Sequence, residues 1–153
     1  MTQNRTTNFI QYGIGLIGAL YTALGVTGFL PLDFLNPMHP EGIGVHYVFN
    51  LVAINALHNF SHLVFGVTGL WAARTLRGAQ LWGKIVGSVL LLLLVAGIAQ
   101  TVLEGFPKDQ MFLGLVPLNS PGHILHLMSG GLALYLGLIR LPSPDSSQTG
   151  SSK

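Results

Sequence analysis

The chain has 153 residues, of which 50% are apolar and only 8% are charged. A soluble domain carries about 25% charged residues, so this chain has too little polar surface to cover a globule in water. It contains no cysteine, which excludes disulfides, thiolate metal sites and iron–sulfur clusters. Its seven Lys and Arg form no basic stripe. The expected partner is therefore the lipid bilayer, and nucleic acid is not.

Four segments are predicted to be membrane-spanning helices, because each supplies about the 20 predominantly apolar residues that a span needs. They cover residues 9–30, 46–73, 85–103 and 121–139. The expected fold is an all-α, four-helix transmembrane bundle over residues 1–142, with a disordered, Ser-rich cytoplasmic tail over 143–153. The second segment exceeds one span, so its polar first half is expected near the outer interface or bent over the bundle.

The positive charges predict the orientation of this bundle. With four spans, six of the seven basic residues fall on one side: Arg5, Arg74, Arg77, Lys84, Arg140 and Lys153. The other side has Lys108 and four acidic residues. Because cytoplasmic loops carry the excess of Lys and Arg, we expect a multi-pass protein of the cell (inner) membrane with both termini in the cytoplasm.

An internal repeat relates the second predicted helix to the fourth when one is shifted along the chain onto the other. The pairs that this shift brings together are Asn55 and Asn119, Asn59 and His123, His62 and His126, Gly66 and Gly130, Gly69 and Ala133, and Ala73 and Gly137. At helical spacing these positions form one stripe on each helix. A weaker similarity joins residues 28–31 to residues 105–107. The pattern predicts two repeated helical hairpins.

The polar part of the stripe is the candidate site. Four histidines lie there, two of them four apart and two three apart: His58, His62, His123 and His126. Two facing pairs would offer four imidazoles to one transition-metal ion. Alternatively, His62 and His126 would ligate one haem b from opposite sides. A third alternative is hydrogen bonding between helices, with Asn55, Asn59 and Asn119 in the same polar cluster.

The small residues of the stripe have a packing role. Gly66, Gly69, Gly130 and Gly137 are predicted to form a close contact between the second and fourth helices. His39 and His46 fall in or beside an outer loop and are expected to be solvated. The chain shows no Ser-His-Asp order, phosphate loop or intramembrane carboxylate pair, so catalytic activity is not expected.

The segment Leu-His-Asn-Phe-Ser-His-Leu-Val-Phe-Gly-Val-Thr-Gly-Leu over residues 57–70 is followed later by Val-Pro-Leu-Asn over 116–119 and Leu-His-Leu over 125–127. On these residues the chain resembles, from about residue 14 to residue 138, a family of small bacterial four-helix integral membrane proteins classified only as a domain of unknown function. The positions that match the family pattern are His58, Asn59, His62, Asn119 and His126. His123 does not match, which makes His62 and His126 the sharper candidates. The resemblance implies membrane location and topology, and it implies no activity.

The leading expectation for function is a small accessory or scaffold subunit of a membrane complex, with other membrane subunits or further copies of itself as partners. The alternatives are an electron-transfer protein holding haem b or a transition metal, and a small channel or transporter.

Overall fold

The computed structural model describes residues 2–30, 45–104 and 110–141. The described chain is mostly helical, as predicted, and has four helices: α1 (Thr2–Phe29), α2 (Ala56–Ala72), α3 (Leu76–Glu104) and α4 (Ser120–Leu138). Four short strands form two antiparallel hairpins: β1 (His46–Val48) with β2 (Val52–Ile54), and β3 (Gln110–Phe112) with β4 (Val116–Leu118). The predicted tail, most of the outer loops, His39 and residues 105–107 lie outside the described residues.

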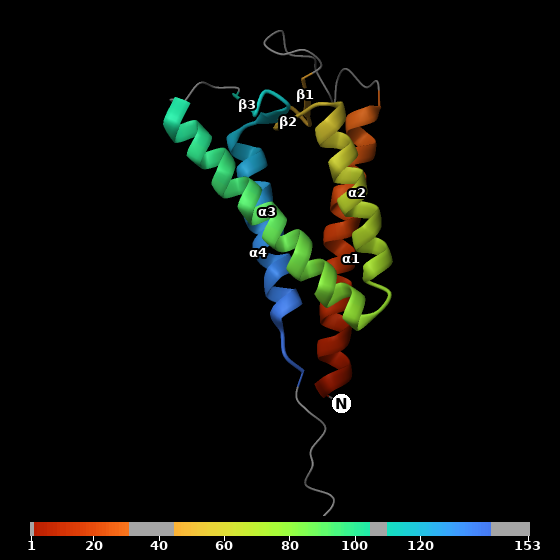
Figure 1. Ribbon diagram of the computed structural model, residues 1–153. Helices are drawn as coiled ribbons and strands as arrows, with labels where there is room; N and C mark the ends of the chain where they lie inside the picture. The colour runs from red at the N-terminus through yellow and green to blue at the C-terminus, as the bar shows by residue number, and fades with distance from the viewer. Residues whose placement is uncertain (1, 31–44, 105–109, 142–153) are drawn as a thin grey trace, which may run out of the picture.

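The four helices run alternately up and down, and both hairpins lie at the end opposite the N-terminus (Figure 1). Helix α1 packs along α2, and α3 packs along α4. The two helix pairs meet at the N-terminal end and diverge toward the hairpins (Figure 1). This divergence opens the bundle where the polar residues of α2 and α4 lie.

Glycines allow the close approach within each pair. A Cβ on Gly18 of α1 would lie 2.7 Å from the backbone N of Leu70 in α2, and one on Gly87 of α3 would lie 2.6 Å from the backbone N of Leu134 in α4. Such distances leave no room for any side chain, so the helix backbones touch. This is the packing that small residues permit where lipid removes the hydrophobic force.

The predicted contact between the second and fourth helices through their glycines is wrong. Gly66 packs on Thr22 of α1, and Gly69 packs on Gly18 and on the ring of Trp82. In the other half, Gly130 and Gly137 pack on α3. These glycines therefore lie mainly against the partner helix of the same pair, and His58, His62 and His126 converge between the pairs.

The second predicted helix is also wrong over residues 46–54, which form the first hairpin. Helix α2 starts only at Ala56, because Asn55 is its N-cap: its backbone is extended (φ −140°) and its Oδ1 accepts a hydrogen bond from His58 N at 2.9 Å. Asn119 caps α4 in the same way, accepting from Gly122 N at 3.0 Å. The helices α1 and α3 begin earlier than predicted, at Thr2 and Leu76.

The two hairpins match under the same shift that takes Asn55 to Asn119. The turn of the first places Phe49 (φ 53°) and Asn50 (φ 57°) in the left-handed region, and the turn of the second places Leu113 (φ 51°) and Gly114 (φ 71°) there. Two such residues in succession characterise the type I′ turn, whose twist suits a hairpin. The strand registers agree too, since His46 pairs with Ile54 as Gln110 pairs with Leu118.

The N-cap asparagines join the two halves. Asn55 Nδ2 donates to the backbone oxygen of Leu115 at 2.6 Å, and Asn119 Nδ2 donates to that of Leu51 at 2.7 Å. Each amide thus caps its own helix and binds the turn of the other hairpin. We call this pair of contacts the asparagine clasp.

Two apolar clusters fill the bundle. The larger, toward the N-terminal end, includes Ile14, Tyr21, Trp82, Leu90 and Leu136. The smaller lies against the hairpins and includes Leu24, Val48 and Ile54. The outer surface is also apolar over most of its length.

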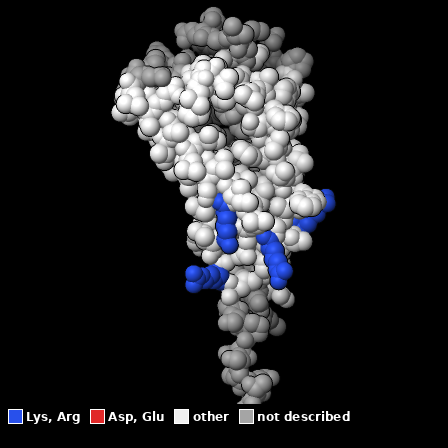
Figure 2. All heavy atoms as spheres, viewed as in Figure 1, with Lys and Arg blue, Asp and Glu red and all other residues white. Residues whose placement is uncertain are grey.

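Two helices are long and apolar enough to cross a membrane, over residues 4–29 of α1 and 76–103 of α3. The Lys and Arg side chains of the described chain gather around the N-terminal end, and the rest of the described surface in this view carries no charge (Figure 2).

Candidate functional site

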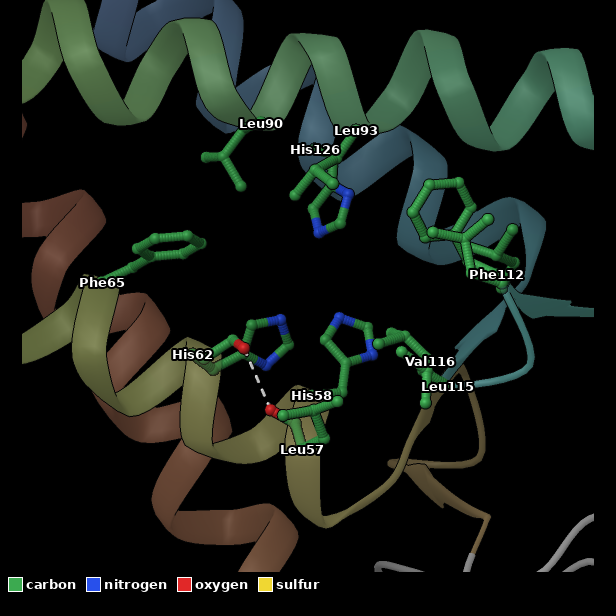
Figure 3. A pocket seen from close by; sticks show the side chains of 13 residues that line it. Leu57, His58, His62, Phe65, Leu90, Leu93, Phe112, Leu115, Val116 and His126 are labelled. Carbon is green, nitrogen blue, oxygen red and sulfur yellow. Dashed lines mark hydrogen bonds between the residues drawn. The ribbon is translucent and has the colours of Figure 1, made fainter.

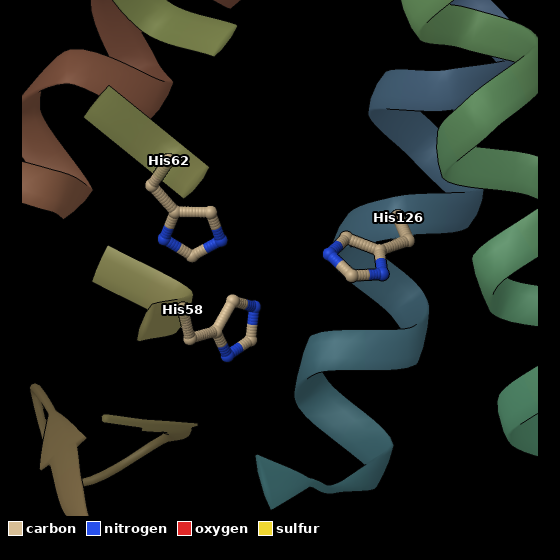
Figure 4. Close-up of side chains that lie close together, drawn as sticks. All are labelled: His58, His62 and His126. Atoms are coloured by element: carbon tan, nitrogen blue, oxygen red, sulfur yellow. The ribbon is translucent and has the colours of Figure 1, made fainter. Parts of the chain in front are cut away.

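Three histidines meet in the opening between the helix pairs. His58 and His62 lie one turn apart on α2, and His126 reaches toward them from α4 (Figure 4). One ring nitrogen from each lies within 4.8 Å of the others. The side chains of His58 and His62 are buried, at 6% and 1% exposed, and that of His126 is partly buried. We call these residues the histidine cluster.

The cluster contains buried nitrogens with no hydrogen-bond partner among the described residues. They are Nδ1 of His58 and both Nδ1 and Nε2 of His62. A buried polar atom left without a partner costs about 1–3 kcal/mol, and a neutral imidazole needs both an acceptor and a donor. Hydrogen bonds among the described residues leave these nitrogens without partners, and a bound ion would take one nitrogen from each ring.

The surroundings hold His62 in place. Its ring stands edge-on to that of Tyr21, with centroids 5.2 Å apart and an interplanar angle of 82°. The Tyr21 hydroxyl shares a 2.8 Å hydrogen bond with Ser129 Oγ, which in turn donates to the backbone oxygen of Leu125. Tyr21 therefore links α1 to α4 beside the cluster. The sequence analysis missed Tyr21 and Ser129; an isolated tyrosine in an apolar helix is a weak signal.

His123 lies outside the histidine cluster. Its ring packs against Gly97 of α3, where a Cβ would approach its Cε1 to 2.8 Å. Asn59, with which the predicted repeat aligns it, is buried and packs in the same way against Gly28 of α1. The structure therefore brings together three of the four predicted histidines. His46 lies in β1 and is partly buried, which differs from the predicted solvated position.

Helices α1 and α3 carry matching contacts. Gln11 Nε2 donates to the backbone oxygen of Ala73 at 2.9 Å, and Gln80 Nε2 donates to that of Ile139 at 2.7 Å. The interval along the chain from Gln11 to Gln80 is the same as that from Gly28 to Gly97. Residues 105–107, on which the weaker similarity was predicted, lie outside the described residues.

The three rings offer one nitrogen each to a single ion, because a nitrogen of His58 lies within 4.8 Å of nitrogens of both His62 and His126. Two of these rings would suffice to hold the iron of haem b. The third ring is therefore the feature that favours an ion.

A pocket of about 270 Å³ adjoins the histidine cluster. The cluster lines one side, and the rest is mainly apolar, with Phe65 from α2, Leu90 and Leu93 from α3, and Phe112 from β3 (Figure 3). A polar cluster at one side of an apolar cavity is the usual arrangement of a small-molecule or cofactor site.

The fold and the cluster define a small four-helix protein with a buried group of histidines between two helix pairs. By sequence the chain belongs to the family described as a domain of unknown function (DUF4383), which it matches over residues 11–139. This confirms the resemblance to an uncharacterised family. Comparison with curated proteins and with solved structures finds no match.

Proposed function

We propose that this chain is an integral membrane protein that binds one divalent transition-metal ion at His58, His62 and His126. The observation that carries the proposal is the convergence of three imidazole nitrogens within 4.8 Å, with unpaired ring nitrogens on the two histidines that are buried. Imidazole suits Zn, Cu, Fe and Ni. The helices and the asparagine clasp supply the frame that holds the three rings.

The distances suit an ion of the Zn²⁺ type. A Zn–N bond is about 2.0–2.1 Å, so nitrogens at the corners of a tetrahedron lie about 3.4 Å apart. Closing from 4.8 Å requires each ring to move by about 0.7 Å or less, which side-chain rotation provides. Three histidine ligands leave the fourth position open, as in sites where Zn²⁺ binds a further ligand.

The membrane location rests on the surface of the protein. Large apolar side chains are exposed along the helices, among them Leu16 and Leu92, at 71% and 68%. Monomeric soluble proteins rarely expose contiguous apolar surface of this extent. The basic residues gather at one end (Figure 2), which by the positive-inside rule is the cytoplasmic end. The bundle then crosses the inner membrane four times, with the histidine cluster in its outer half.

The hairpins are compatible with this location. Helix α2 has 17 residues and spans about 26 Å, somewhat less than the hydrocarbon core of about 30 Å. The β1–β2 hairpin continues the segment outward, and its backbone groups are paired within the hairpin and by the asparagine clasp. Non-helical backbone is tolerated at this depth where it is satisfied and packed against protein.

We further infer that the two halves arose by duplication of one helix–hairpin–helix unit. The shift that takes Asn55 to Asn119 relates the turns, the strand registers, the N-caps and the clasp. In this unit, one position provides a metal ligand in each copy, His62 and His126. His58 has no histidine counterpart, because its equivalent in the second copy is Gly122. The metal site therefore belongs to the pair of units and not to either alone.

The other predicted functions receive less support. A purely structural cluster would pair its polar atoms, and three imidazole nitrogens here are unpaired. A water-filled channel would need a polar path toward the cytoplasmic end, where the larger apolar cluster lies. An accessory or scaffold role in a membrane complex is compatible with a bound ion.

Metal content tests the proposal. The protein is purified in mild detergent, treated with chelator, loaded with Zn²⁺, freed of excess ion and analysed for bound metal and for visible absorption. We expect about one Zn²⁺ per chain and no Soret band. His62→Ala and His126→Ala should lose the ion, whereas His123→Ala should keep it, because His123 contacts α3 outside the cluster.

Folded wild-type protein that binds no Zn²⁺, Cu²⁺ or Co²⁺ would overturn the metal site. A Soret band that His62→Ala abolishes would establish the haem alternative in its place. Loss of the ion in all variants, His123→Ala included, would show that binding follows general stability and not coordination by the cluster.

A further inference from the structure

The pocket beside the histidine cluster has an apolar route to the outside. Leu57, Leu113 and Leu115 line the pocket and are also 46%, 73% and 58% exposed on the surface of the molecule. In the orientation proposed above, this surface faces the outer part of the bilayer. A molecule that dissolves in lipid can therefore reach the histidines from the side, without crossing a polar barrier.

Charge determines which molecules the pocket favours. Three neutral imidazoles around a divalent ion leave a net charge of +2, and a charge in apolar surroundings is costly unless an opposite charge accompanies it. None of the side chains that the structure describes is an Asp or Glu, so no described carboxylate stands near the ion. An anion that comes with the fourth ligand would compensate this charge.

The shape of the pocket indicates what carries that anion. Its lining beyond the histidines is almost wholly apolar, with Phe65 from α2, Leu90 and Leu93 from α3, and Ser61 as the one hydroxyl (Figure 3). The pocket of about 270 Å³ therefore has room for an apolar group beside the histidines. A carboxylate that carries an aliphatic chain matches both parts of this lining.

We propose that the pocket binds a fatty acid, with its carboxylate on the open position of the metal ion and its aliphatic chain along Phe65, Leu90 and Leu93. This inference rests on the proposed metal site. The carboxylate neutralises part of the ion's charge, and the chain removes the apolar lining from water and lipid headgroups. A neutral lipid lacks the first contribution, and a small carboxylate such as acetate lacks the second.

Cobalt spectroscopy tests the inference. Co²⁺ replaces Zn²⁺ in the purified protein, and its visible d–d bands report any change among its ligands. Octanoate is titrated against acetate, which has the head group without the chain, and against octanol, which has the chain without the charge. We expect octanoate to shift the bands at a concentration at least tenfold below that of acetate, and octanol to leave them unchanged.

A matched pair of variants locates the chain. Leu93 lines the pocket, whereas its neighbour Leu92 is outside the lining and 68% exposed. Leu93→Trp should reduce the preference for octanoate to near the acetate level and keep the Co²⁺ spectrum in its absence. Leu92→Trp should retain the full preference. If Leu93→Trp fails to fold, the comparison of octanoate with acetate in the wild type still tests the fatty-acid site.

The outcomes separate the two proposals. Protein that binds no Co²⁺ overturns the metal site and the fatty-acid site together. Protein that binds Co²⁺ but responds to octanoate no better than to acetate overturns the fatty-acid site alone. An equal response to octanol would also overturn it, because the carboxylate would then play no part.

Discussion

His62 is 1% exposed, and neither of its ring nitrogens has a hydrogen-bond partner within the part of the chain that the structure describes. Without a ligand, this side chain is therefore a source of instability. Leucine has a similar reach and no polar atom to satisfy, and replacing an unpaired buried polar group with an apolar one of similar shape avoids the desolvation cost. We therefore attribute the presence of His62 to ligand binding and not to packing.

We predict that His62→Leu stabilises the metal-free protein by about 1 kcal/mol, since the gain of about 1–3 kcal/mol from removing unpaired atoms is partly offset by the lost contact with Tyr21. Thermal unfolding in detergent with chelator measures this difference. Adding Zn²⁺ should raise the midpoint of the wild type and leave the variant unchanged. A lower midpoint for metal-free His62→Leu would indicate that the histidine serves packing alone.

The sequence carried a signal that separates His123 from the cluster. The predicted repeat aligns Asn59 with His123, and both pack on a glycine of their own partner helix, Gly28 and Gly97. It also aligns His62 with His126, and both belong to the histidine cluster. Because position 59 holds Asn, the alignment favoured a packing role for His123. His58, the third member of the cluster, aligns with no histidine, so only its spacing of one turn from His62 indicated it.

At the scale of elements, the helices were predictable and the hairpins were not. Residues 46–54 are mainly apolar and run directly into the apolar helix that follows, so hydrophobicity alone merged them into one span. Asn55 and Asn119 provided the missing boundary, since Asn is a preferred N-cap. The turns were not predictable from the sequence, because Phe49 and Leu113 occupy the left-handed region that bulky residues seldom adopt.

The asparagine clasp predicts a difference between two substitutions. Asn119→Ala removes the cap on α4 and the hydrogen bond to Leu51, whereas Asn119→Asp keeps an acceptor for the cap and loses the donor. We expect Asn119→Ala to cost about 1–3 kcal/mol and Asn119→Asp clearly less, since capping contributes about 0.5–2 kcal/mol. Denaturation in mixed micelles measures both. Equal costs would mean that the cap contributes nothing beyond the clasp.

The glycines of α2 and α4 differ in what surrounds them. A Cβ on Gly66 would collide with the backbone and Oγ1 of Thr22, whereas one on Gly131 would meet nothing within 4 Å. We predict that Gly66→Ala destabilises the protein by about 1–3 kcal/mol through overpacking. Gly131→Ala, the matched control, should stabilise it by about 0.5–1 kcal/mol through helix propensity. Unfolding midpoints compare the two. A stable Gly66→Ala would show that α1 and α2 are not in close contact.

At the scale of the molecule, the contacts that hold the bundle together and the histidine cluster lie at different levels along it. Glycines hold each helix pair together, the larger apolar cluster joins the pairs toward the N-terminal end, and the asparagine clasp joins them at the other. Between these two joints the pairs diverge, and the histidine cluster lies there (Figure 1). Closing the rings around an ion would draw the pairs together, so a bound ion should stiffen the whole bundle.

The orientation of the bundle can be tested with single cysteines, because the natural chain contains none. His39 falls in the outer loop predicted from the sequence, and Thr75 lies exposed in the turn between α2 and α3, at the basic end. If the basic end is cytoplasmic, a membrane-impermeant maleimide should label His39→Cys in intact cells and Thr75→Cys only after the membrane is permeabilised. The reverse pattern would invert the topology and place the histidine cluster in the inner half. Labelling of both cysteines without permeabilisation would show that the two positions do not lie on opposite sides of a membrane. It would also remove the basis for a fatty acid that enters from the bilayer.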